Sequence, residues 1–497
     1  MRARVLLRRV AHAACLLGVL LSLPQAVAGP ALPPLADIYH DEAQRLIGAA
    51  LTSEHAYDRL SQLCDGIGHR LSGSSELARA VEWAAAAMRE DGLRVRLQPV
   101  MVPRWVRGSE SAEMLAPRRV RLAMLGLGRS VGTPKRGLTA DVVVADSFDH
   151  LDALPDSAVR GKIVLFDVPF TTYGETVRYR GRGANAAADR GAVAMLLRSV
   201  GPVSLRTPHT GALTYEPREG EPAPERKIPA AALSIEDATM IRRLSERGHK
   251  VRVHLQMQAQ ILPDVLSHNV IGELPGREQP DEVVVLGGHL DSWDVGQGAH
   301  DDGGGCVIAM EAVRLIQQLG LRPRRTLRVV LWTNEENGLR GGQAYRDSLG
   351  GDFGSHVAAI ESDGGMERPV GFGVAVKFEP GDDDGQARHL RSLARAREIA
   401  PLLAGIGADR IDENGGGADI GPLMQNGVPG IAHRTVMENY FHWHHTEADM
   451  LDKVDPVELR KNVAALAVLA FVLADMPARL DDPLLAGTGG PSPGSTK

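Results

Sequence analysis

Between residues 283 and 362 the sequence alternates short, almost wholly apolar runs with helical segments. The apolar runs are VVVLGGHL (283–290), TLRVVLWTN (326–334) and HVAAIES (356–362), and helices are predicted at 306–319 and 342–349. Runs of Val, Ile and Leu with few polar residues are typical of parallel strands that are buried on both faces. The pattern therefore predicts an α/β fold with a mostly parallel central sheet between layers of helices.

A second pattern interrupts this one. The chain has 497 residues, more than one hydrophobic core usually holds. After a predicted helix at 75–90 and a strand at 93–100, residues 110–262 carry short β-like runs separated by Gly, Pro and Asp. The alternating pattern then resumes. We expect one α/β domain, made of residues 51–109 and 263–483, that is interrupted by a β-rich insertion at 110–262.

The two ends of the chain differ from this globular part. Four arginines precede an apolar run and an Ala-x-Ala cleavage site at residues 26–28, so residues 1–28 are predicted to be a secretory signal peptide. The protein is therefore expected to be secreted or periplasmic. Residues 29–50 are interpreted as a linker or prosegment. The Gly-, Pro- and Ser-rich tail at 484–497 is predicted to be disordered.

Composition excludes several classes of protein. Apolar residues make up 43% and charged residues 24%, as in ordinary soluble domains. Loss of the four signal-peptide arginines takes the formal charge from −6 to −10, and basic runs are absent, which argues against nucleic acid or an anionic membrane as a partner. Only Cys64 and Cys306 remain after cleavage, too few for a disulfide framework.

Acidic and histidine residues follow directly after the predicted strands. His289 ends the first run, Glu335 and Glu336 end the second, and Asp363 ends the third. In open α/β sheets the ligand site lies beyond the carboxyl ends of the strands, so these side chains should meet there. Imidazole and carboxylate groups are ligands for divalent metals, and the set predicts a hydrolase with two metals.

Two further acids complete the predicted metal site. Asp301 is interpreted as a carboxylate that bridges two closely spaced cations, which need a shared anion to reduce their repulsion. For its neighbour Asp302, two roles carry equal weight: a carboxylate of the metal site, or a helix N-cap. Asp291 is placed to accept the second ring N–H of His289 and so to fix its tautomer. We therefore count Asp291 with the catalytic residues.

The Glu335–Glu336 pair separates two roles. Successive side chains of an extended segment point apart, so Glu336 is assigned to a metal and Glu335 to the attacking water as general base. Three histidines, His442, His444 and His445, cluster in the segment FHWHHTEAD. His445 is chosen as the metal ligand, and the other two are expected to line the rim.

With these motifs assembled, the chain resembles the secreted co-catalytic zinc exopeptidases related to carboxypeptidase Q and to bacterial zinc aminopeptidases. The resemblance rests on GGHLDSWDVGQGAHDDGGG, TLRVVLWTNEENG, ESDGG, NGVPG, HHTEADMLDKVDP and, near the start, DGIGHRLSGS. It implies a phosphorylase/hydrolase-like three-layer sandwich as the catalytic domain and a protease-associated domain as the insertion.

The resemblance also implies the arrangement of the site. One zinc takes His289 and Asp363, the other takes Glu336 and His445, Asp301 bridges them, and Glu335 is the base. The substrate would be a dipeptide or short peptide, and the assembly a homodimer. Three alternatives stay open at this point: an amidohydrolase acting on N-acyl amino acids, a single-metal glutaminyl cyclase, and a binding ectodomain that has lost catalysis. The preferred end of the peptide is also open.

Overall fold

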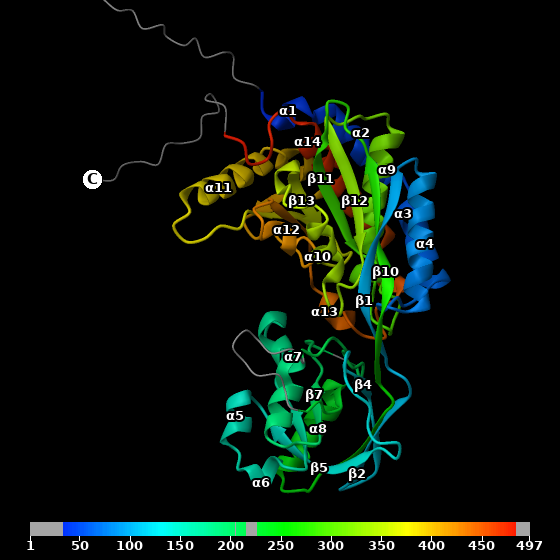
Figure 1. The fold of residues 1–497 in the computed structure, drawn as a ribbon, viewed down its shortest axis with the longest axis vertical. Coiled ribbons are helices and arrows are strands. Elements are labelled where there is room, and N and C mark those ends of the chain that lie inside the picture. The colour runs from blue at the N-terminus through cyan, green and yellow to red at the C-terminus, as the bar shows by residue number, and fades with distance from the viewer. Residues whose placement is uncertain (1–32, 204, 215–225, 484–497) are drawn as a thin grey trace, which may run out of the picture. The chain divides into compact units, whose positions relative to one another are not determined.

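The computed structural model describes residues 33–203, 205–214 and 226–483 (Figure 1). The predicted signal peptide, the first residues of the predicted linker and the predicted C-terminal tail lie outside these described residues. The described part of the predicted linker or prosegment forms two helices, α1 (Leu35–Ile38) and α2 (His40–Leu51). Among the described residues, we find no helix with the length and apolar character needed to cross a membrane.

The described strands form two eight-stranded sheets in a mixed α/β fold. The first sheet has four parallel and three antiparallel pairings, and three of the parallel ones join its four central strands. Its strands, in spatial order, are β1 (Arg94–Val106), β10 (Gln260–Leu274), β12 (Arg325–Trp332), β11 (Gln279–His289), β13 (His356–Glu361), β16 (Gly430–Thr435), β14 (Pro369–Ala375) and β15 (Arg410–Asp412). The four strands β12, β11, β13 and β16 are the parallel centre that the apolar runs predict.

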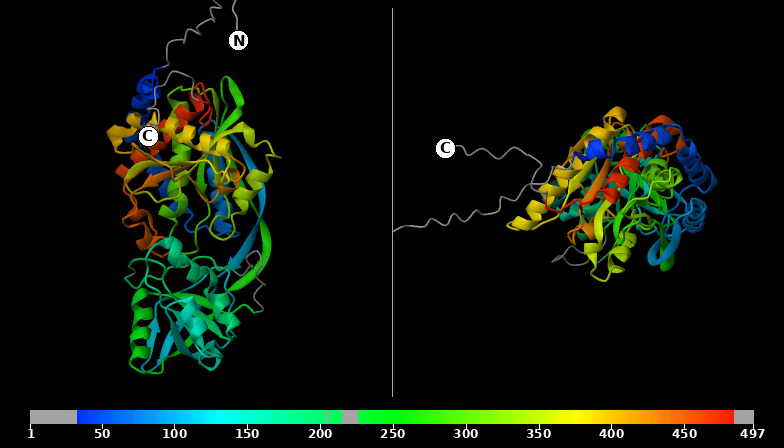
Figure 2. Two further views of the ribbon diagram at one scale, coloured as in Figure 1. Left: turned by 90° about the vertical axis from the view of Figure 1, so that its left-hand side faces the viewer. Right: turned by 90° about the horizontal axis from the view of Figure 1, so that it is seen from above.

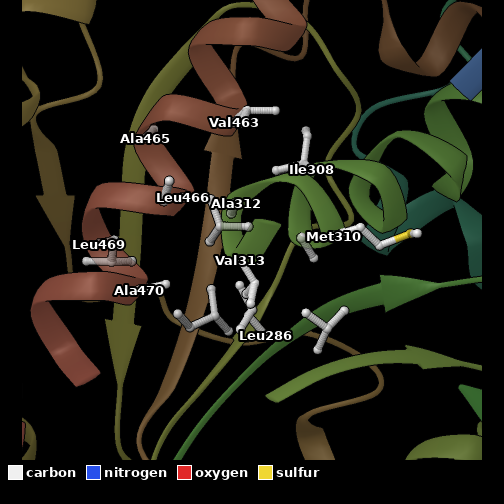
Figure 3. Packing of buried hydrophobic residues seen from close by; sticks show 14 of the residues in the cluster. Leu286, Ile308, Met310, Ala312, Val313, Val463, Ala465, Leu466, Leu469 and Ala470 are labelled. Carbon is white, nitrogen blue, oxygen red and sulfur yellow. The ribbon is translucent and has the colours of Figure 1, made fainter. Parts of the chain in front are cut away.

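Each face of the first sheet has its own core. Along β11, Val284 and Leu286 enter one apolar cluster, whereas Val283 and Val285 enter another on the opposite face. Successive side chains of a strand alternate between faces, so a strand that is apolar at every position is buried on both. The first cluster includes α9 (Gly304–Gln318) and α14 (Pro456–Asp475), which Figure 3 shows packed against Leu286.

The helix α14 is buried on all sides. Every residue from Val463 to Ala474 is buried, and the helix packs on α9 and α2. Asp455 caps its first turn by accepting a hydrogen bond from the N–H of Val457 at 2.7 Å. The apolar run at 463–474 is therefore a core helix, as its short length indicates. A buried leucine such as Leu466 contributes about 2–3 kcal/mol through the hydrophobic effect.

All strands of the second sheet come from the segment predicted to be an insertion (Figure 2). They are, in spatial order, β3 (Val120–Leu122), β2 (Glu110–Ala116), β9 (Arg252–Met257), β5 (Leu138–Ala145), β6 (Ile163–Phe166), β7 (Ala194–Arg198), β8 (Ala230–Leu233) and β4 (Met124–Gly126). One face packs on α7 (Tyr173–Asp189), through Phe166 and Tyr179, and the other on α8 (Ile235–Glu246), through Leu165 and Ile241.

The remaining helices belong to three groups. Those of the chain's first hundred residues, besides α1 and α2, are α3 (His55–Gly66) and α4 (Ser75–Glu90). Those of the second-sheet segment, besides α7 and α8, are α5 (Phe148–Ala153) and α6 (Asp156–Val159). Those after β12, besides α14, are α10 (Arg340–Asp347), α11 (Asp383–Arg397), α12 (Gly421–Met424) and α13 (Tyr440–Trp443).

His356, at the start of β13, makes the stability of the fold sensitive to acid. Burial, with the charges of Arg328 and Arg479, lowers the pKa of His356 to about 4. The unfolded chain takes up this proton near pH 6.5. Between about pH 6.5 and 4 the unfolded state therefore binds more protons than the folded state, so stability falls as the pH falls through this window.

We predict that His356→Gln flattens this pH dependence. One fewer proton taken up on unfolding reduces the slope of the unfolding free energy by up to about 1.4 kcal/mol per pH unit near pH 5. The glutamine amide can still pair with the hydroxyl of Tyr345, which lies 2.9 Å from His356 Nε2. Urea unfolding at several pH values between 4.5 and 7 measures the slope. Equal slopes for the two proteins would contradict the prediction.

Candidate metal centre

Five side chains predicted from the sequence converge at the carboxyl ends of β11, β12 and β13. They form two sets that share Asp301. In one set, His289 Nε2 lies 3.2 Å from Asp301 Oδ1 and 3.7 Å from Asp363 Oδ1. In the other, His445 Nε2 lies 3.2 Å from Asp301 Oδ2 and 3.1 Å from Glu336 Oε2. The two oxygens of Asp301 thus face different sets, as a bridging carboxylate requires.

Burial of this cluster indicates that it holds cations. Exposed fractions are 1% for His289, 5% for Asp301, 7% for Glu336 and 8% for His445. Three carboxylate oxygens, Asp301 Oδ2, Glu336 Oε1 and Asp363 Oδ1, are buried without a hydrogen-bond donor. Buried carboxylates without donors cost free energy unless they are paired or bind a metal. Oxygen and imidazole donors in this mixture suit zinc.

The loop that carries Asp301 is ordered by the carboxylate of Asp449. Asp449 accepts hydrogen bonds from the N–H groups of Ala299, His300 and Asp301 at 2.8–3.2 Å. Asp449 belongs to the HHTEAD motif, which also carries His445. One segment therefore supplies the ligand His445 and orders the loop of a second ligand, Asp301. The signal for this role was present in the motif, but the sequence does not indicate which backbone groups Asp449 binds.

Arg70 and Asp302 hold the same region from the other side. Arg70 is fully buried and donates to the carbonyl groups of Leu290, Gln297 and Gly298, which joins the end of β11 to the following loop. Asp302 accepts from the N–H of Gly305 at 3.1 Å and from the N–H of His289 at 3.0 Å. Asp302 therefore caps the start of α9, which was one of its two predicted roles.

Asp291 does not bind the ring of His289 as expected. His289 Nδ1 lies 2.9 Å from the backbone carbonyl of Asp291 and 3.8 Å from its carboxylate. The carboxylate instead accepts from the N–H of Glu335 at 3.1 Å and the N–H of Glu336 at 3.4 Å, both in the turn after β12, and from the hydroxyl of Ser72 at 3.0 Å. It fixes the segment that carries the two glutamates, because a buried carboxylate binds the nearest free N–H groups.

We predict that Asp291→Ala disturbs the glutamates rather than His289. Loss of the acceptor leaves the buried N–H of Glu336 and the part-buried N–H of Glu335 without this partner, which should lower the free energy of unfolding by about 1–3 kcal/mol. Misplaced glutamates should lower kcat by about 10- to 100-fold. Urea unfolding and steady-state kinetics measure both effects. Ser72→Ala, which removes one donor and leaves the acceptor in place, is the matched control, and wild-type kcat in Asp291→Ala would contradict the prediction.

Glu335 lies beside the two sets, partly exposed, while Glu336 is buried. Burial raises the pKa of Glu335 well above its usual range; His289 opposes this shift, and Asp363 and Glu336 add to it. Burial and Asp301 raise the pKa of Glu336 to about 7, against the opposing charge of His445. Cations among these side chains would favour the ionised carboxylates. Asp363 is also partly exposed, so Glu335 and Asp363 are more exposed than His289, Asp301, Glu336 and His445.

The histidine segment is packed more tightly than expected. His444 was expected at the rim but is buried, stacks on His445 with ring centroids 3.7 Å apart, and has Nε2 3.5 Å from Asp301 Oδ2. Of the two histidines predicted to line the rim, His442 is half-buried and His444 is buried. His445 adopts a left-handed backbone conformation, with φ of 60°, that turns its ring to the other ligands. Cys306 is fully buried within α9.

The second-sheet segment reaches His445 directly. The N–H of Thr210 donates to the carbonyl of His445 at 2.9 Å, and Arg180 Nη1 lies 3.2 Å from His445 Nδ1. No motif in the sequence indicates these residues, since they lie in a loop and a helix far from the ligands along the chain. Sequence reasoning therefore missed them.

The comparisons with known proteins agree with this geometry. The family model described as Peptidase family M28 matches residues 269–470. The chain is 42% identical to carboxypeptidase Q of Mus musculus over 446 residues, covering 89% of this chain and 91% of that protein. The chain belongs to peptidase family M28. The resemblance to co-catalytic zinc exopeptidases that the motifs indicated is thereby confirmed.

Solved structures extend the agreement to the fold. A peptidase M28 precursor from Shewanella amazonensis has a TM-score of 0.82 and 36% identity, covering 90% of this chain and 99% of that one. A zinc aminopeptidase from Bacillus subtilis has a TM-score of 0.62 at 19% identity, covering 86% of this chain and 97% of that one, and so shares the fold. The two-sheet architecture is thus that of solved M28 peptidases.

Proposed function

We propose that this protein is a secreted zinc exopeptidase that hydrolyses peptide bonds in dipeptides or short peptides. The observation that carries the proposal is the pair of ligand sets that share Asp301, with Glu335 beside them, in a member of peptidase family M28. His289 and Asp363 would hold one zinc ion and Glu336 and His445 the other. Asp301 would bridge the two.

The chain's own residues divide the chemistry between them. When bound, the zinc ions would lower the pKa of a coordinated water and polarise the scissile carbonyl. Glu335 would accept the water's proton during attack and return it to the leaving amine, since it is partly exposed beside the ligand sets while Glu336 is buried. Asp291 would hold Glu335 in place through the Glu335 N–H.

We also propose the finer domain assignments. Residues 1–28 would be the signal peptide, 29–50 a linker or prosegment, and 484–497 a disordered tail. Residues 51–109 and 263–483 would form a phosphorylase/hydrolase-like three-layer sandwich, and 110–262 a protease-associated domain. The two buried faces of the first sheet support the sandwich. A homodimer is proposed as the assembly.

Metal analysis together with a substrate panel tests the function. The purified mature protein should contain two zinc ions per chain and hydrolyse dipeptides with free termini. An N-acyl amino acid hydrolysed faster than every dipeptide would favour an amidohydrolase. A folded protein that neither binds zinc nor cleaves any peptide of the panel would refute the proposal and favour a binding ectodomain.

A further inference from the structure

His444, directly after α13, is a buried imidazole that the proposed chemistry leaves without a role. Only 6% of the residue is exposed. Its Nδ1 is buried without a hydrogen-bond partner among the described residues, and its Nε2 lies 3.5 Å from Asp301 Oδ2, too far for a good hydrogen bond. His300, which is also buried, uses both ring nitrogens: Nδ1 accepts from the N–H of Met366 at 3.0 Å, and Nε2 lies 3.1 Å from the carbonyl of Lys453. The ring of His444 therefore still has hydrogen-bonding capacity.

Aromatic rings hold the imidazole of His444 in one orientation. It stacks on the ring of His445, with centroids 3.7 Å apart and planes inclined by 18°. Tyr440 and Phe441, both of α13, lie against it with ring centroids at 5.0 Å and 5.5 Å. A ring that is packed on several sides has little freedom to turn, so the fold fixes the direction of Nε2.

The stacking on His445 argues against His444 as a second ligand for the same ion. Asp301, His444 and His445 offer ligand atoms within 4.8 Å of one another, so a shared ion has to be considered. An imidazole binds a metal along the lone pair of its nitrogen, which lies in the plane of the ring. Stacked rings have nearly parallel planes, so an ion in the plane of His445 lies outside the plane of His444. His445 is the better ligand, because its Nε2 also lies 3.1 Å from Glu336 Oε2.

The proton of His444 belongs on the nitrogen that faces the metal centre. A neutral imidazole has one N–H and one lone pair. Nε2 faces the carboxylate of Asp301, which only accepts, whereas Nδ1 has no partner among the described residues. The N–H therefore points from Nε2 towards the ligand cluster. Asp301 would be occupied when cations are bound, and the N–H would then need another acceptor.

The acceptor that hydrolysis brings to this position is the oxygen of the scissile carbonyl. When water adds to the carbonyl carbon, this oxygen gains negative charge, and N–H donors that are already oriented stabilise the charge. Such a donor acts mainly on the transition state, so its loss changes kcat more than KM.

We propose that His444 is a catalytic residue, which donates a hydrogen bond from Nε2 to the scissile carbonyl oxygen as negative charge develops on it. The inference rests on the proposed function and adds a second reacting group to it. Glu335 would act on the water, and His444 on the carbonyl. Because His444 is a donor and not a ligand, its removal should leave the metal content unchanged.

The test combines kinetics with ligand binding. His444→Phe removes both nitrogens and keeps a ring that can stack on His445, whereas His444→Gln keeps an N–H donor near the position of Nε2. Zinc content, kcat and KM are measured with the best dipeptide of the panel. Calorimetry measures the affinity for a phosphinic analogue of that dipeptide, whose charged oxygen stands in for the developing oxyanion. His442→Phe is the matched control, because His442 is a half-buried histidine of α13.

His444→Phe should lower kcat by about 10²- to 10³-fold with little change in KM. The affinity for the phosphinic analogue should fall by a similar factor, and two zinc ions per chain should remain. His444→Gln should recover part of both losses, and His442→Phe should behave as wild type. If His444→Phe does not fold, His444→Leu, which is of similar size and has no donor, takes its place.

Three results would overturn the inference. A kcat and an analogue affinity close to wild type in His444→Phe would show that the donor is not used. Fewer than two zinc ions in that variant would make His444 a ligand. A His444→Gln variant as slow as His444→Phe would mean that the ring matters and the donor does not. Absence of both zinc and peptidase activity in wild type would instead refute the proposed function.

Discussion

Glu335→Gln should lower kcat by about 10²- to 10⁴-fold while the zinc content stays at two per chain. The amide is nearly isosteric with the carboxylate but cannot take a proton from water. Burial raises the pKa of Glu335 well above its usual range, and bound cations would oppose that shift and favour the ionised carboxylate that a base needs. KM should change little, because Glu335 is proposed to act on water and not to hold the peptide.

The controls for Glu335 come from its own surroundings. The hydrogen bond from its backbone N–H to Asp291 remains in the variant, so the fold should be unaffected. Zinc analysis, urea unfolding and steady-state kinetics on the same preparation separate the possibilities. Near-normal kcat with full metal content would mean that another group takes the proton. Loss of zinc would mean that Glu335 is a ligand, and that its role and that of Glu336 were exchanged.

The parts of the fold that the sequence predicts well are those where burial alone decides. The runs at 283–290, 326–334 and 356–362 become β11, β12 and β13 because strands buried on both faces must be apolar throughout. The edge strand β1 was predicted to end near residue 100, but it continues to Val106 through Pro99 and Pro103. It pairs with β10 on one side only, and an edge strand tolerates proline there.

The same distinction applies to the site. The ligand residues follow strand ends, so their convergence follows from the topology of a parallel sheet. The hydrogen bonds around these ligands do not follow from the topology. Asp291 binds the N–H groups of the turn after β12 instead of the nearby ring, and Arg180 approaches from α7 of the second-sheet segment. Both contacts join segments that are distant along the chain, and no local pattern specifies which donor meets which acceptor.

Asp301→Asn should have the largest effect at the metal centre. The carboxylate presents Oδ1 to His289 and Oδ2 to His445, and an amide keeps one oxygen while its NH₂ group repels a cation. We expect at least one zinc per chain to be lost and kcat to fall by about 10³-fold or more. Asp302→Asn is the matched control: it loses one of two backbone N–H contacts, to Gly305 or His289, which should lower stability, but it should keep both zinc ions. Two zinc ions in Asp301→Asn would contradict the assignment of the bridge to Asp301, and zinc loss in Asp302→Asn alone would point to the neighbouring acid.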